Sequence, residues 1–334
     1  MATLREAVDS VAERTGFAGV VRVDGTHECD MSTAYGFADR AHQVPNTPDT
    51  QLATASVTKT FTALAVMALV ETGALGLDTT ARSLLGRDLP LVAEDVTVEH
   101  LLAHRSGIGD YLDEDLIDGI TSYALPVPVH TLDSTESFLP LLDGHPTVFP
   151  AGSSFAYNNG GYVLLALLTE RASGLGFHDL VRSLVWEPAG MTDTAFLRSD
   201  ELPARAAHGY LTVEGLRSNV LLLPVLGNGD GGAYSTATDL RAFWEALFAG
   251  RIVPGERVAE MVRPRSEWPA EKRRYGLGIH LAAQGEGVWL EGYDAGVSAR
   301  STHQPSTGAT YTVISNWTDG AWPVVSVLDE WLAG

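Results

Sequence analysis

Two side chains with the types and the spacing for chemistry open an apolar segment of the chain. Ser56 and Lys59 lie three residues apart, directly before residues 60–70, whose apolar pattern predicts a helix. Residues at i and i+3 share one helix face, and the N–H groups of a first turn favour a developing oxyanion. A serine hydroxyl needs a base to become a nucleophile. Because the ordinary pKa of a lysine is about 10.4, a lysine is that base only when its surroundings hold it neutral.

A second pair of polar groups follows about 100 residues later, in the segment Tyr157-Asn158-Asn159. A tyrosine hydroxyl can relay a proton, and a carboxamide can orient the lysine or a substrate amide. Each motif alone has an ordinary interpretation: a serine N-cap before a solvated lysine, a loop aromatic and a turn asparagine. Together they predict Ser56, Lys59 and Tyr157 as catalytic residues and Asn159 as a substrate-binding residue.

These motifs belong to a longer series that resembles the serine β-lactamase and penicillin-binding-protein superfamily. The resemblance is to its class C-like branch of esterases, D-aminopeptidases and β-lactamases, and residues 96–107 are similar to the family's tv-x-x-LL-x-H-x-SG signature. The other matching segments, in the family's order, are residues 49–59, 150–152, 155–159, 187–191 and 231–240. The resemblance implies an α+β fold, in which an antiparallel sheet is built from both chain ends, flanked by N- and C-terminal helices, with a mostly helical domain inserted.

Hydrophobic periodicity agrees with that architecture. The chain ends read as a helix at 4–14, strands at 20–23, 32–36, 275–281, 287–291, 297–302 and 310–315, and a helix at 322–332. Helical patterns broken by Pro- and Gly-rich loops dominate the middle. We therefore expect a sheet domain of residues 1–77 and 241–334 and an inserted helical domain of residues 78–240, with the catalytic groups in the cleft between them.

The family's third motif, Lys-Thr-Gly or His-x-Gly on the strand that borders the site, is altered in this chain. In residues 292–298, Tyr293 takes the place of the lysine or histidine and Ala295 that of the glycine. By resemblance, the N–H of Ala295 or Gly296 should join that of Ser56 in the oxyanion hole. The lost cation disfavours β-lactams and D-Ala-D-Ala, whose carboxylate it would bind, and favours an ester or a neutral amide.

Four more residues are expected to shape the pocket: Tyr293, Asp294, Tyr111 and Trp317. For the aromatic residues, an ordinary place in the core or on the surface is the alternative.

The resemblance implies a serine hydrolase that acts through an acyl-enzyme on an ester or small amide, of the carboxylesterase or D-amino acid amidase/peptidase type. Three alternatives stay open: a β-lactamase or D-Ala-D-Ala carboxypeptidase, an acyltransferase or peptide-cyclising enzyme, and a non-catalytic binding protein on the same fold. Retention of Ser56, Lys59 and Tyr157 counts against the binding protein, because a binder gains nothing from a buried amine beside a hydroxyl.

Composition limits the partners. The 22 basic and 42 acidic residues give a net charge of −20, which disfavours nucleic acid and membrane surfaces and leaves a small-molecule or peptide substrate. The oligomeric state is left open. The single cysteine, Cys29, cannot form an intrachain disulfide and lies in a segment read as a turn, and the first residues show no apolar leader, so we expect a cytoplasmic protein.

Three further patterns were weighed and set aside. Residues 227–232 match G-x-G-x-x-G but lack a βαβ context, so we expect a loop, which the resemblance places at the border of the cleft. His100 and His104 have metal-site spacing, yet Leu101 stands where the glutamate of H-E-x-x-H belongs, so no metal or other cofactor is expected. The sequence has no G-x-S-x-G, which argues against an α/β-hydrolase.

Overall fold

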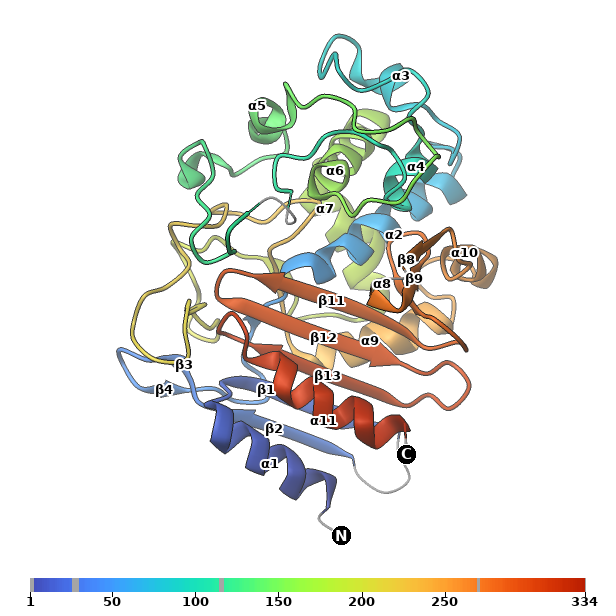
Figure 1. The fold of residues 1–334 in the computed structure, drawn as a ribbon. Coiled ribbons are helices and arrows are strands. Elements are labelled where there is room, and N and C mark those ends of the chain that lie inside the picture. Colours follow the sequence, from blue (N-terminus) through green and yellow to red (C-terminus); the bar gives the residue numbers. More distant parts are fainter. Residues whose placement is uncertain (1–2, 26–29, 114–116, 269–270, 334) are drawn as a thin grey trace.

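The computed structural model describes residues 3–25, 30–113, 117–268 and 271–333; Cys29 and the turn expected around it lie outside them. Within these residues an eight-stranded antiparallel sheet has the order β2-β1-β13-β12-β11-β10-β9-β8 (Figure 1). Its strands are β1 (Gly19–Asp24), β2 (Met31–Tyr35), β8 (Ser266–Trp268), β9 (Arg273–Tyr275), β10 (His280–Ala282), β11 (Val288–Asp294), β12 (Val297–His303) and β13 (Thr310–Ser315).

The two ends of the chain meet near one edge of this sheet, where β1 and β13 are its second and third strands. β1 pairs with β13 from Gly19↔Ser315 to Asp24↔Thr310, and helices α1 (Leu4–Thr15) and α11 (Ala321–Ala333) lie together on one face of the sheet (Figure 1). α1 begins with a capping box between Thr3 and Glu6. Apolar side chains of α1, α11, β1 and β13 form one core cluster. The α+β fold with a sheet from both chain ends is therefore confirmed.

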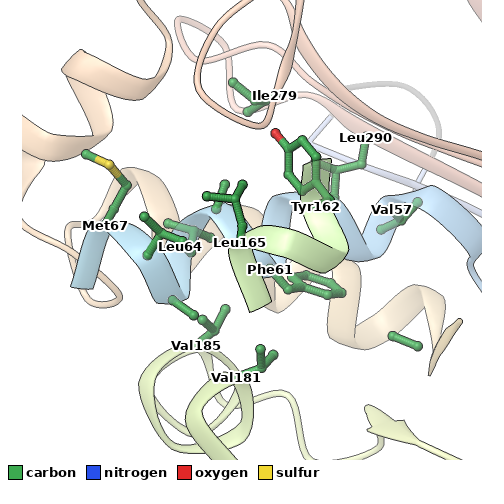
Figure 2. Close-up of a cluster of buried hydrophobic side chains, with 14 of the residues drawn as sticks. Val57, Phe61, Leu64, Met67, Tyr162, Leu165, Val181, Val185, Ile279 and Leu290 are labelled. Carbon is green, nitrogen blue, oxygen red and sulfur yellow. The ribbon is translucent and has the colours of Figure 1, made fainter. Parts of the chain in front are cut away.

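Helix α9 (Ala237–Phe248) covers the opposite face. Helix α2 (Thr58–Glu71) lies next to β11, and helix α6 (Asn159–Ser173) packs against α2 (Figure 1). Both α2 and α6 are buried along most of their length. Figure 2 shows Phe61 and Leu64 of α2 among Tyr162 and Leu165 of α6, in the larger hydrophobic core. This packing fixes the N-terminus of α2 against the N-terminus of α6, and these two helix ends carry the candidate site.

Short elements and irregular segments make up much of the remainder. The helical ones are η1 (Ala55–Val57), α3 (Ala81–Leu85), α4 (Val98–Leu102), η2 (Val129–Thr131), η3 (Glu136–Phe138), α5 (Leu139–Leu142), α7 (Phe177–Val181), the π-helical η4 (Arg182–Trp186), α8 (Glu187–Ala189) and α10 (Gly255–Met261). Two small sheets join β3 (Phe37–Asp39) to β4 (Val44–Pro45), and β5 (Leu52–Ala53) to β7 (Ala233–Ser235) and β6 (Ala195–Phe196).

One predicted strand was wrong. Residues 275–281 form the ends of β9 and β10 with a turn between them, because Gly278 adopts a φ of 76° and Gly276 packs so closely on Met261 O that a Cβ would lie 2.0 Å from it. Strand β8 and the two small sheets were not predicted. The domain boundaries at residues 78 and 240 stay a prediction. No helix of the described residues is long and apolar enough to cross a membrane.

Candidate active site

The position of Ser56 is set by a tight turn between β5 and α2. Ala55, which is buried, has a φ of 47°, an uncommon conformation for a residue with a Cβ. The hydroxyl of Thr58 donates to Ala55 O at 2.8 Å and accepts from Ala233 N at 3.0 Å, which ties the turn to β7. Ser56 is thereby held at the N-terminus of α2, where the N–H groups of the first turn are free of intrahelical partners.

Lys59 is 1% exposed and its Nζ lies within hydrogen-bond distance of three oxygens. These are Ser56 Oγ at 2.9 Å, Asn159 Oδ1 at 2.8 Å and the backbone oxygen of Asp230 at 2.7 Å. An ammonium satisfies all three contacts as a donor. A neutral amine satisfies the same three by donating two N–H bonds and accepting the Ser56 O–H, which is the arrangement that a base requires.

Asn159 is oriented by the segment that follows α4. Its Nδ2 donates to Leu112 O at 2.9 Å, so its Oδ1 faces Lys59. Its backbone N–H donates to Asp110 Oδ2 at 2.6 Å, and Gly160 N donates to the other oxygen of Asp110 at 2.8 Å. Burial raises the pKa of Asp110 to about 6, although these N–H bonds oppose the rise. Asp110 thus caps the start of α6 and holds Asn159 in place.

Tyr157 lies near Lys59, whose Nζ is 5.0 Å from the centre of the tyrosine ring. The ring packs on His104 with a centroid distance of 4.3 Å and on Trp268 at 5.9 Å. His104 Nδ1 accepts the backbone N–H of Asn158 at 3.0 Å, and burial holds the pKa of His104 well below its usual value. A neutral imidazole with its proton on Nε2 therefore supports the Tyr157 ring.

Ser56 lines two cavities. The larger encloses about 1020 Å³, open to solvent, and its lining includes Tyr111, Asn159, Asp230, Tyr293 and Asp294 together with many apolar side chains. The smaller encloses about 350 Å³ and is lined by Ser56, Tyr157, Trp268, Arg273, His280, Glu291 and Tyr293. The structure therefore brings Ser56, Lys59, Tyr157, Asn159, Tyr111, Tyr293 and Asp294 into one region.

The loop of residues 227–232 borders the larger cavity, as predicted. A Cβ on Gly229 would lie 2.1 Å from Tyr162 O, so a glycine is needed where this loop packs on α6. Asp230 Oδ2 accepts from the Tyr111 hydroxyl at 2.5 Å, and burial raises the pKa of both groups. The loop supplies one oxygen to Lys59 and one acidic wall of the cavity.

The register of β11 differs from the expected alignment of the third motif. A Cβ on Gly292 would lie 2.0 Å from Thr54 O and 3.1 Å from Ser56 N, so β11 passes close to the nucleophile at Gly292. The N–H groups of Ala295 and Gly296 are already used, in bonds to Asp294 Oδ1 at 2.8 Å and Thr318 Oγ1 at 2.9 Å. This geometry contradicts the expected donor role of Ala295 or Gly296.

Trp317, which was expected to shape the pocket, lies outside the two cavities. It follows β13, its carbonyl accepts from Ser298 Oγ at 3.1 Å, and it is absent from the lining of both cavities as far as the chain is described. Sequence reasoning missed Asp110, Asp230, Gly292 and Arg273. Of these, Gly292 was recognisable from the sequence, because it ends a Leu-Glu-Gly sequence at residues 290–292 that has the spacing of the third motif.

His100 and His104 form hydrogen bonds to the protein backbone. The Nδ1 of His100 accepts the N–H of Thr97, and the Nδ1 of His104 accepts the N–H of Asn158. In the described part of the chain no group of three or more His, Cys, Asp or Glu residues is placed to hold a metal ion.

Comparison with known proteins agrees with this geometry. The Beta-lactamase family model matches residues 4–329. Penicillin-binding protein 4* of Bacillus subtilis is 27% identical over 313 residues, which cover 90% of this chain and 67% of that protein. Esterase EstB of Burkholderia gladioli is 30% identical over 291 residues, covering 78% and 74% of the two chains. This chain spans about two thirds of the length of the Bacillus subtilis penicillin-binding proteins that it matches.

Solved structures give the same assignment. A penicillin-binding protein from Bacillus halodurans superposes with a TM-score of 0.90 at 33% identity, over 97% of this chain and 99% of that one. D-amino acid amidase from Ochrobactrum anthropi SV3 superposes with a TM-score of 0.80 at 26% identity, over 99% and 98%. The chain therefore belongs to the Beta-lactamase family, within the serine β-lactamase and penicillin-binding-protein superfamily. Its relatives include an esterase, an amidase and penicillin-binding proteins, which supports a serine hydrolase.

Proposed function

We propose that the protein is a serine hydrolase that cleaves an ester or small amide through an acyl-enzyme on Ser56. The observation that carries this proposal is the contact of 2.9 Å between Lys59 Nζ and Ser56 Oγ, made by a lysine that is 1% exposed. A buried amine that touches a hydroxyl at a helix start has the geometry of a base and its nucleophile. The esterase and the amidase among the relatives are consistent with both substrate classes.

In the proposed mechanism, Ser56 Oγ attacks the substrate carbonyl while Lys59 takes its proton. Tyr157 passes a proton to the leaving atom. Asn159, fixed by Asp110 and Leu112, holds Lys59 in place and lines the larger cavity. Water then attacks the acyl-enzyme by the reverse proton path and frees Ser56.

The oxyanion that forms on the carbonyl needs donors beside Ser56. We propose the Ser56 N–H as one donor and a backbone N–H of the Gly292–Tyr293 segment as the other, because β11 approaches Ser56 N closely at Gly292. Because Gly292 has no side chain, β11 can lie this close to Thr54 and Ser56. The third motif thus keeps its backbone function in this chain even though its cation is replaced by Leu290, which is buried.

The test is a panel of p-nitrophenyl esters and D-amino acid amides with wild type and Ser56→Ala in parallel. We expect turnover of esters by wild type, none by Ser56→Ala, and a covalent fluorophosphonate adduct on Ser56 by intact mass. A wild-type protein that neither turns over a member of the panel nor reacts with the probe would favour a binding protein on this fold.

A further inference from the structure

In the proposed mechanism, the two cavities beside Ser56 receive different parts of the substrate. Among the described residues, Tyr157 lines only the smaller cavity and Asn159 only the larger one. A group that protonates the leaving atom must lie on the side of the leaving group. Because Tyr157 has this role in the proposed mechanism, the leaving group lies toward the smaller cavity and the acyl part lies in the larger one.

One wall of the larger cavity is the apolar segment of residues 222–225, whose backbone is held at both ends. Before this segment, the buried Asn219 donates from Nδ2 to Ala295 O at 2.9 Å. At its end, Val225 N donates to Val129 O at 3.1 Å. These bonds join the segment to the turn after β11 and to η2, so its side chains form a wall of fixed position.

A second wall comes from Tyr111, Tyr123 and Leu125, which line the same cavity. Tyr111 and Leu125 also pack against a small hydrophobic core cluster. The Tyr123 hydroxyl donates to Tyr111 O at 3.0 Å, and the Tyr111 hydroxyl donates to Asp230 Oδ2 at 2.5 Å. Because both hydroxyls are bonded to protein oxygens, the rings are the parts of these side chains that are left for an apolar contact.

The apolar side chains of these walls are only partly buried. Leu125, Leu222 and Leu223 keep intermediate exposure while they line the cavity. Leu221, the residue before the 222–225 segment, is 79% exposed and does not belong to the lining. Water contacts an apolar cavity wall until a ligand covers it, so an apolar group that enters the cavity gains free energy by displacing that water.

The larger cavity is unfavourable for an anion. Asp230 and Asp294 line it, whereas no Lys, Arg or His of the described residues does. Asp294 Oδ1 accepts the Ala295 N–H at 2.8 Å, and Asp230 accepts the Tyr111 hydroxyl, so both carboxyl groups are held in place. A carboxylate on the acyl part would meet these acids without a cation among the lining residues. The lining therefore favours an uncharged acyl chain.

We propose that the larger cavity is an acyl pocket for an uncharged aliphatic chain longer than acetyl, with the 222–225 segment as the wall that selects it. The substrate class is then an ester of an aliphatic monocarboxylic acid. The bond from Ser56 Oγ to the acyl carbon forms, the bond to the alcohol oxygen breaks, and the proton of Ser56 reaches that oxygen through Lys59 and Tyr157. Water then releases the aliphatic acid and restores Ser56. This inference rests on the proposed function.

The experiment compares two isomers, ethyl hexanoate and hexyl acetate, which differ in whether the longer chain lies on the acyl or on the alcohol side. Each kcat/KM is divided by the hydroxide-catalysed rate of the same ester, which removes the difference in intrinsic reactivity. Burial of one methylene group gives about fourfold, or about 0.8 kcal/mol, so two buried methylene groups give about 16-fold. We expect wild type to prefer ethyl hexanoate by at least about tenfold. The monoethyl ester of hexanedioic acid, which adds a carboxylate to the acyl chain, should react at least about tenfold more slowly than ethyl hexanoate.

The variant Leu223→Asn tests the wall, and Leu221→Asn is its matched control. Both replace a leucine of one short segment by the same polar residue, but only Leu223 lines the cavity. The readout is the ratio of kcat/KM for ethyl hexanoate to that for ethyl acetate, which a general loss of folded protein does not change. Leu223→Asn should lower this ratio by at least about threefold, and Leu221→Asn should keep the wild-type ratio.

The outcomes separate the acyl pocket from the proposed function. Equal use of the two isomers by wild type, a preference for hexyl acetate, or the same ratio in Leu223→Asn and wild type would overturn the acyl pocket and leave the serine hydrolase in place. Equal use of ethyl hexanoate and the carboxylate ester would overturn the selection for an uncharged chain. If wild type cleaves none of the esters and Ser56 forms no covalent adduct, the proposed function fails and the acyl pocket fails with it.

Discussion

Substituting Gly292 by alanine tests the proposed oxyanion hole with one methyl group. The added Cβ would lie 2.0 Å from Thr54 O and 3.1 Å from Ser56 N, whereas ordinary contacts begin at 3.4 Å. Strand β11 must therefore retreat from Thr54 by about 1.4 Å, the difference between these distances. A displacement of about 1 Å can cost about 100-fold in rate, and loss of one oxyanion donor costs about 100- to 1000-fold in kcat. We expect kcat to fall by at least about 100-fold.

The assay is the pre-steady-state acylation rate with a p-nitrophenyl ester, measured together with the Tm. Because the donor acts on the transition state, KM should change much less than kcat. Gly255→Ala is the matched control: a Cβ at Gly255 meets nothing within 4 Å, so this variant should acylate at the wild-type rate. A folded Gly292→Ala protein that acylates as fast as Gly255→Ala would refute the assignment of the oxyanion hole to this gap.

Three further predictions concern single side chains. Tyr157→Phe keeps the ring on His104 but removes the hydroxyl, so kcat for an ester should fall by about 100-fold or more with little change in Tm; a loss below about threefold would exclude a proton relay. Asp110→Ala removes the acceptor of the Asn159 and Gly160 N–H groups, so the Tm and kcat should both fall, with a stability loss of about 1 kcal/mol from the cap alone; an unchanged kcat would separate Asp110 from the site. Burial lowers the pKa of His280 from 6.5 to about 3. As the pH falls, His280 therefore binds a proton in the unfolded chain before it does so in the folded protein, and the stability of the fold decreases from pH 6.5 toward pH 3. Through His280 alone the protein should be about 3 kcal/mol less stable at pH 4.5 than at pH 7.5, and His280→Gln should lack this part of the pH dependence in urea unfolding; identical pH profiles would contradict a buried neutral His280.

Local spacing was enough to predict the parts of the site that depend on short-range geometry. Ser56 and Lys59 meet because they lie one turn apart at the start of α2, and their contact of 2.9 Å follows from that spacing. The core that brings Asn159 to Lys59 joins two apolar helices, which periodicity also predicts. The strands at both chain ends were predictable from their alternating patterns, except where Gly276 and Gly278 make a turn inside an apolar run.

Contacts between distant segments were not predictable in this way. Arg273 and Glu291 lie on different strands, and the sequence gives no sign that their ion pair borders Ser56. The position of Gly292 depends on the register of β11, and a shift of register moves each side chain to another neighbour.

In the proposed mechanism, Lys59 makes Ser56 reactive. The direct measurement is the rate at which a fluorophosphonate modifies Ser56, followed by intact mass, in wild type and in Lys59→Met. Methionine fills the buried volume of Lys59 without an amine, so the fold is expected to persist. We expect one adduct per chain on Ser56 in wild type and a rate at least about 1000-fold lower in Lys59→Met. Equal rates in the two proteins would contradict it.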